Sequence, residues 1–61
     1  MTNLEWKIKH QLKIINELHE EYQREYTKNQ DDKIMNNIYR DLIITTEAQI
    51  SILNELLQEW Q

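Results

Sequence analysis

The residues that could perform nucleophilic or phosphate chemistry are few in this chain of 61 residues. There is no cysteine, and Ser51 is the only serine. A serine nucleophile needs a base beside it and is often presented on a sharp turn that contains glycine, but the sequence has no glycine. The lack of glycine also excludes the loop that wraps phosphate groups in nucleotide-binding proteins. We therefore expect a protein that is not an enzyme and that uses no cofactor.

The densest group of potential metal ligands is the segment Glu17-Leu18-His19-Glu20-Glu21. Helical bundles that hold two metal ions use an inward-facing Glu-x-x-His motif, which is absent here. We expect no metal, and instead a solvated helix face with ion pairs such as Glu20 with Arg24. A lone histidine beside an apolar stripe usually packs at its rim, so we expect His19 there, with one ring nitrogen in solvent.

A second group of functional residues lies near the N-terminus, where Trp6, Lys9, His10 and Lys13 share the outer face of a predicted helix. A mixture of cations and aromatic rings can hold single strands or RNA. The chain as a whole is acidic, with a net charge of −4 and a pI near 5.0, whereas domains that bind duplexes usually have a pI above about 9. The composition disfavours nucleic acid as the main partner, and RNA binding through this patch is the alternative.

This patch is positioned by a helix that we predict over residues 2–28. Apolar residues recur in it every three or four positions, at Leu4, Ile8, Leu12, Ile15, Leu18, Tyr22 and Tyr26. Thr2 and Glu5 have the spacing of a capping box, in which each side chain accepts a hydrogen bond from a backbone N–H at the helix start. With Thr2 as the N-cap, Met1 and Trp6 occupy the positions of a hydrophobic staple, which explains Trp6 without a binding role.

A second helix is predicted over residues 32–60. Its main apolar face consists of Met35, Ile38, Tyr39, Leu42, Ile52, Leu53, Leu56 and Trp60. If the chain were one continuous helix, the first stripe would run on through Glu25, Asn29, Asp32 and Asn36, leaving about three turns of the seam without an apolar residue. A turn between the two segments removes this defect.

The turn is predicted at residues 29–31. Asn29 can adopt the left-handed conformation that otherwise calls for glycine. Asp31 and Asp32 suit a helix N-terminus, where a carboxylate caps backbone N–H groups and meets the positive end of the helix dipole.

The expected fold is all-α, a two-helix antiparallel hairpin that forms a single domain over residues 1–61. In this hairpin Tyr22 lies near Tyr39, because opposite residues have numbers that sum to about 61. A continuous coiled-coil rod about 90 Å long is the alternative. A domain of this size buries only about 60% of its unfolded surface, so we expect it to be supplemented by self-association or by a partner.

The helix over residues 32–60 carries more apolar residues than a hairpin needs. Ile43, Ile50 and Leu57 repeat at intervals of seven residues, with Ile44 beside the first of them, whereas the equivalent positions of the other helix are polar. We expect this row, together with Trp60, to be covered from outside the hairpin. One candidate is a second copy, which would complete an antiparallel four-helix bundle; the other is a different protein that binds the same row.

Two families of small helical proteins share the predicted architecture. The hairpin resembles the RNA-binding plasmid copy-number regulators of the Rop type, which are homodimers; the resemblance is one of architecture, without a shared motif, and it implies RNA as the partner. The chain is also similar in length and layout to the aspartyl phosphatases of sporulation control, whose signature in the second helix is Ser-Gln-x-x-Asp. The nearest segment here, Asn37-Ile38-Tyr39-Arg40-Asp41, keeps only the aspartate. We do not carry phosphatase activity over to Asp41, which we expect to be a solvent-facing acid.

The composition also bears on location and role. No apolar run approaches the ~20 residues needed to span a bilayer, and the N-terminus lacks the order of a signal peptide, so we expect a cytoplasmic protein. The residue bias indicates AT-rich coding DNA, as in low-GC bacteria and their phages. We expect a small non-enzymatic regulator or inhibitor that forms a homodimer and binds another protein through an apolar and acidic helix face.

Overall fold

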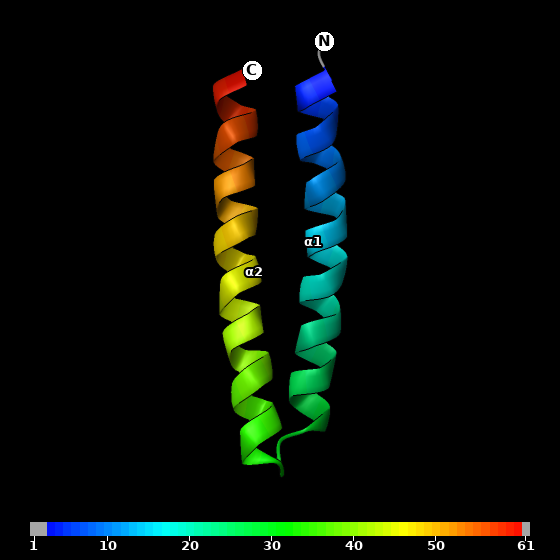
Figure 1. The fold of residues 1–61 in the computed structure, drawn as a ribbon, viewed down its shortest axis with the longest axis vertical. Coiled ribbons are helices and arrows are strands. Elements are labelled where there is room, and N and C mark those ends of the chain that lie inside the picture. The colour runs from blue at the N-terminus through cyan, green and yellow to red at the C-terminus, as the bar shows by residue number, and fades with distance from the viewer. Residues whose placement is uncertain (1–2, 61) are drawn as a thin grey trace.

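A computed structural model describes residues 3–60 of the chain, without the side chain of residue 60. It contains two helices, α1 (Asn3–Lys28) and α2 (Lys33–Trp60). The helices run side by side in opposite directions, and both termini lie at the end away from the turn (Figure 1). The Cα trace extends 47 × 14 × 11 Å. The predicted hairpin is therefore confirmed, and the alternative of one continuous rod is wrong.

Some predicted features fall on residues outside the described part of the chain. The capping box needs Thr2 and the hydrophobic staple needs Met1, and both residues lie before residue 3. Within residues 3–60, no helix combines the length and the apolar content that crossing a bilayer requires.

The turn after Lys28 is closed by Asn29, although not in the predicted way. The backbone N–H of Asn29 donates to the Glu25 carbonyl at 3.0 Å, and the Asn29 side-chain amide donates to the same oxygen at 2.7 Å. No residue in the described chain has a positive φ, so the prediction that Asn29 adopts the left-handed conformation is wrong. The side-chain amide thus adds a second hydrogen bond to a carbonyl of the last helical turn, without the left-handed residue that often ends a helix.

Asp32 caps the start of α2, as predicted. Its carboxylate oxygen Oδ1 accepts a hydrogen bond from the Met35 backbone N–H at 3.1 Å, the geometry of an N-cap. Asn36, in the first turn of α2, donates its side-chain amide to the Tyr26 carbonyl near the end of α1 at 3.1 Å. This bond ties the two helix ends together and satisfies a carbonyl that has no partner within α1.

The contact between the helices buries few side chains completely. Among residues 3–59, Ile8 is the one buried apolar side chain (7% exposed) and Thr46 the one buried polar side chain (5% exposed). The half-buried contact residues include Leu12, Ile15 and Tyr26 of α1 and Met35, Leu42 and Leu53 of α2. The rings of Tyr22 and Tyr39 lie 6.2 Å apart between centroids, which confirms the pair predicted from the hairpin register.

The side of α2 that faces α1 differs in part from the prediction. Three residues predicted on the contact face are exposed, namely Ile38, Ile52 and Leu56. Three residues of the row predicted to lie outside the hairpin are half-buried, namely Ile43, Ile50 and Leu57. The reason is the rotation of α2 about its own axis, which places Thr46 against His19 and Tyr39 against Tyr22. Ile43 and Ile50 lie three and four residues from Thr46 and therefore turn toward α1 with it.

Candidate functional site

His19 and Thr46 form a polar pair inside the otherwise apolar contact between the helices. The ring nitrogen Nδ1 of His19 lies 2.8 Å from the Thr46 hydroxyl oxygen, which also lies 3.0 Å from the carbonyls of Leu42 and Ile43. The hydroxyl has a single hydrogen, which these carbonyls attract, so we assign the Nδ1 hydrogen of His19 as the donor to the hydroxyl. His19 is half-buried and turns its ring toward α2, inside the contact, whereas the sequence predicted a place at the rim of the stripe. This pair holds the helices together.

Metal binding finds no geometric support in the described residues. Among residues 3–60, no three His, Asp or Glu side chains are grouped so that they could hold a metal ion. The carboxylates around His19 are mostly exposed on the outside of α1.

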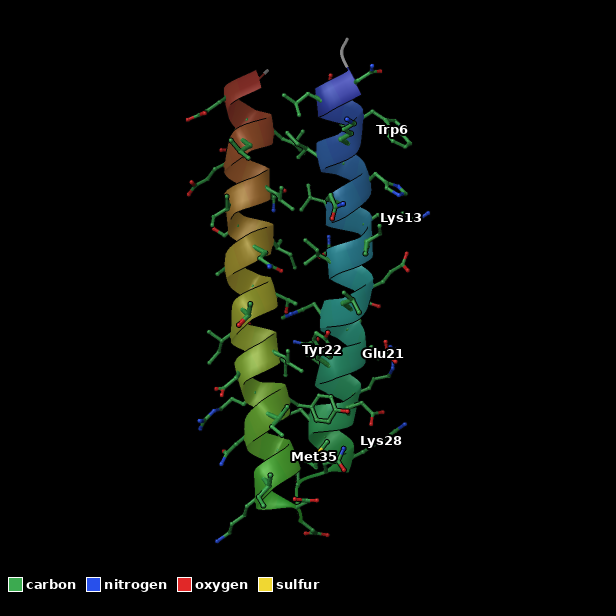
Figure 2. All side chains as sticks on the ribbon, viewed as in Figure 1. Trp6, Lys13, Glu21, Tyr22, Lys28 and Met35 are labelled. Atoms are coloured by element: carbon green, nitrogen blue, oxygen red, sulfur yellow. The ribbon has the colours of Figure 1, made fainter. Side chains whose placement is uncertain are left out.

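The predicted nucleic-acid patch is brought together only in part. The rings of Trp6 and His10 are stacked, with centroids 5.0 Å apart and planes 6° apart, and Trp6 is 64% exposed. Trp6 and Lys13 point away from α2 (Figure 2). Lys9 forms an ion pair with Glu5 at 3.3 Å, which reduces the positive charge available to a phosphate. The contacts of this patch are therefore the aromatic stack of Trp6 and His10 and the ion pair of Lys9, with Lys13 pointing outward on the same helix.

The exposed large apolar side chains gather mainly on one side of the hairpin. A groove of about 260 Å³ on this side is lined by Gln11 and Ile15 of α1 and by Gln49, Ile52 and Leu53 of α2. Helix periodicity extends the groove in both directions, because residues three, four and seven apart lie on the same helix face. We call this surface the apolar side, and its exposed apolar residues are Leu4, Ile14 and Leu18 of α1 and Ile34, Ile38, Ile52 and Leu56 of α2.

The opposite side of the hairpin exposes fewer large apolar residues. It has its own groove of about 440 Å³, lined by Gln23, Tyr26, Thr27, Arg40, Ile43 and Ile44. Ile44 is the exposed large aliphatic residue here, and its exposed fraction of 58% matches the 57% of Ile52 on the apolar side. We call this surface the polar side. The two isoleucines form a natural matched pair, because they differ mainly in the side of the hairpin that they occupy.

The candidate interface predicted from the sequence is divided by the structure. Ile43, Ile50 and Leu57 are half-buried, and Ile43 also lines the groove of the polar side. Ile44 lies exposed on the polar side, and the side chain of Trp60 lies outside the described residues. Sequence reasoning missed the contribution of α1 to the exposed surface. The available signal was the repeat of Leu4, Gln11 and Leu18 at intervals of seven residues, which marks a flank of the stripe instead of its centre.

No protein-family model matches the chain, and comparison with curated proteins and with solved structures found no match. The functional proposal therefore rests on the surfaces of the hairpin itself.

Proposed function

We propose that this chain is a small, non-enzymatic protein-binding regulator or inhibitor that acts through the apolar side. One observation carries the proposal: apart from Trp6 and Ile44, the exposed large apolar residues of both helices fall on the same side of the hairpin, along a groove that both helices line. Scattered exposed apolar residues are normal on a protein surface, but a continuous apolar surface is typical of a protein interface. The mechanism is occlusion, in which the apolar side covers a functional surface of another polypeptide.

The composition of the apolar side suits a protein partner better than a lipid one. Its centre contains the amides of Gln11 and Gln49, which can form directed hydrogen bonds within an interface. The acids Asp41, Glu55 and Glu59 each follow an apolar-side residue by three positions and are exposed. These carboxylates would be repelled by anionic lipid head groups. A protein surface is therefore the occupant that we expect.

The proposal is tested with a matched pair of substitutions in α2. Ile52→Glu places a charge on the apolar side, and Ile44→Glu makes the same change at a residue of equal exposure on the polar side. Tagged wild-type protein, expressed and cross-linked in cells, should retain specific polypeptides other than copies of itself. We expect Ile44→Glu to retain the same polypeptides in similar amounts. Ile52→Glu should retain at least tenfold less of each, because burying an unpaired carboxylate in the interface costs several kcal/mol.

Two results would count against this function. One is retention of the same polypeptides by both variants, which would place binding elsewhere on the hairpin. The other is loss of binding in both variants, which would indicate general damage to the helices. Helicity measured by circular dichroism on all three proteins separates this damage from a true interface effect.

A further inference from the structure

We propose that the occupant of the apolar side, in the protein on its own, is a second copy of this chain packed face to face. In this arrangement α1 lies antiparallel along α1 of the second copy, and Lys7 lies opposite Glu25 of that copy. The inference rests on the proposed role of the apolar side as a protein-binding surface and names its partner. The product is a four-helix bundle in which each hairpin supplies two helices.

The hairpin alone buries little of its surface. Its accessible area is 4846 Å², whereas a compact protein of its mass, 7.6 kDa, would expose about 4,300 Å². Among residues 3–59, Ile8 is the one apolar side chain that is buried. A two-helix unit with so small a core is marginal, and small domains of this kind usually need oligomerisation when they lack disulfides and metals.

The size of the apolar side also fits a second copy. The hairpin is 47 Å long along its Cα trace. Two adjacent helices of about 10 Å diameter make a face about 20 Å wide, hence roughly 900 Å². A standard stable interface uses about 800 Å² of each partner, so a second hairpin has the dimensions needed to cover this side completely.

The order of residues along the edge of α1 also fits a second copy. Lys7 and Glu25 are 18 residues apart, which is five helical turns, so they point in nearly the same direction. Ile14 and Leu18 lie between them on the same edge. A two-fold axis at the level of residue 16 places Lys7 on Glu25 of the second copy, and Ile14 on its Leu18. Two antiparallel copies of α1 therefore place opposite charges, and apolar side chains, against each other along this edge.

The alternative face-to-face arrangement, with α1 against α2 of the second copy, is less favourable. The cross-helix pairs Tyr22–Tyr39 and His19–Thr46 have numbers that sum to 61 and 65, so Lys7 would then lie near the level of Leu56 of the second copy, and Glu25 near the level of its Ile38. Glu25 is already half-buried, and Lys28 at 3.4 Å is its partner within the hairpin, so covering this ion pair with an apolar side chain would cost desolvation energy without adding a new charged contact.

Packing α1 on α1 also packs α2 on α2 of the second copy, which brings acidic residues of α2 to the same level. The repulsion between them costs less than the desolvation of Glu25. Asp41 comes to the level of Glu55 of the second copy, but both residues are exposed and lie on the outer edge, where solvent screens their repulsion. Gln49 lines the groove beside Ile15, close to the two-fold axis. Its amide can therefore pair with Gln49 of the second copy, which satisfies a polar group that the bundle would otherwise bury alone.

The test is sedimentation equilibrium of the full chain over a range of concentrations, with Lys7→Glu, Glu25→Lys and the double variant that exchanges the two charges. We expect the wild type to have twice the chain mass of 7.6 kDa. Each single variant should raise the dimer dissociation constant by about tenfold, since the contact occurs twice per dimer and attraction becomes repulsion. The double variant should return to within about threefold of the wild type, because the exchanged charges attract again.

These variants protect the test from loss of helix. Lys7→Glu puts an acid near the start of α1 and Glu25→Lys puts a base near its end, and both changes favour the helix dipole. Glu25→Lys also removes the ion pair of Glu25 with Lys28 at 3.4 Å, so Lys7→Glu is the more informative single variant. A wild type that stays monomeric would overturn the inference. So would a dissociation constant that Lys7→Glu leaves unchanged, or one that the double variant does not restore.

Failure of this inference is distinguishable from failure of the proposed function. A monomer that still binds another polypeptide, with loss in Ile52→Glu and retention in Ile44→Glu, would overturn the second copy as occupant and leave the apolar side as a protein-binding surface. A dimer that is insensitive to the charge exchange but is lost in Ile52→Glu would keep the apolar side as the surface of self-association and overturn the proposed pairing of α1 with α1.

Discussion

At the scale of single residues, His19 and Thr46 join the two helices near the middle of their contact. The 2.8 Å distance between the His19 ring nitrogen and the Thr46 hydroxyl, together with the burial of Thr46, makes this a polar contact that neither helix could satisfy alone. A half-buried N–H that loses its acceptor costs about 1–3 kcal/mol, whereas a surface hydroxyl contributes little.

Thr46→Val should therefore lower the free energy of unfolding by about 1–2 kcal/mol, because it keeps the shape of the side chain and removes the acceptor of His19. Urea unfolding followed by circular dichroism measures the change. Thr45→Val is the matched control. The Thr45 hydroxyl also donates to a carbonyl four residues earlier, that of Asp41, at 2.9 Å, but it is exposed and this bond lies within α2. Equal losses in the two variants would contradict the role assigned to the pair.

The sequence predicted part of this contact. That His19 lies near the apolar stripe could be read directly, but its place inside the contact instead of at the rim could not. Its partner could not, because a threonine in a helix usually bonds its own backbone, as the Thr46 hydroxyl also does. Whether Thr45 or Thr46 meets His19 depends on the position of α2 along α1 and on its rotation about its own axis. Both are set by the packing of the two helices.

At the scale of the elements, the helix ends depend on local hydrogen bonds that the residue types make available. Asp32 caps α2 through its carboxylate, and Asn29 and Asn36 supply amides to carbonyls near the end of α1. The chain thus closes a tight turn without glycine or proline.

Asp32→Ala should destabilise the hairpin by about 1 kcal/mol, because the Met35 N–H loses its acceptor at the N-cap. Thermal unfolding at constant protein concentration measures this change. Asp32→Asn should retain most of the stability, since asparagine is an equally good N-cap. Asp31→Ala removes the same charge one residue earlier, and a loss as large as that of Asp32→Ala would show that charge, and not the cap, is responsible.

Helix boundaries could be predicted because their signals are local. The polar run at 29–31 interrupts both apolar stripes, and Asp32 has the residue type of an N-cap, so the turn was placed correctly. The conformation of Asn29 was predicted wrongly, because its amide replaces the left-handed turn with a direct bond to Glu25.

At the scale of the whole molecule, the hairpin has an apolar side and a polar side. If association through the apolar side supplies the missing burial, stability must depend on protein concentration by mass action. The melting temperature of the wild type should therefore rise with each tenfold increase in concentration, by a few degrees for a protein of this size.

The same dependence should persist in Ile44→Glu and disappear in Ile52→Glu, which differ in the side of the hairpin that receives the charge. Differential scanning calorimetry or circular dichroism over a hundredfold range of concentration makes the comparison. A wild-type melting temperature that is independent of concentration would mean that the small core of the hairpin is sufficient by itself.

The amino-acid sequence by itself determined the two helices, the place of the turn and the surplus of apolar residues in the second half of the chain. These features follow from residue type and from spacings of three, four and seven, which act within a few turns of one helix. The tertiary structure alone decided which apolar residues are exposed. Because α2 is apolar on both flanks of its central stripe, its sequence is compatible with more than one rotation about its axis. Packing of Thr46 on His19 and of Tyr39 on Tyr22 selected one rotation, and left Ile38, Ile52 and Leu56 beside Leu4 and Leu18 on the apolar side.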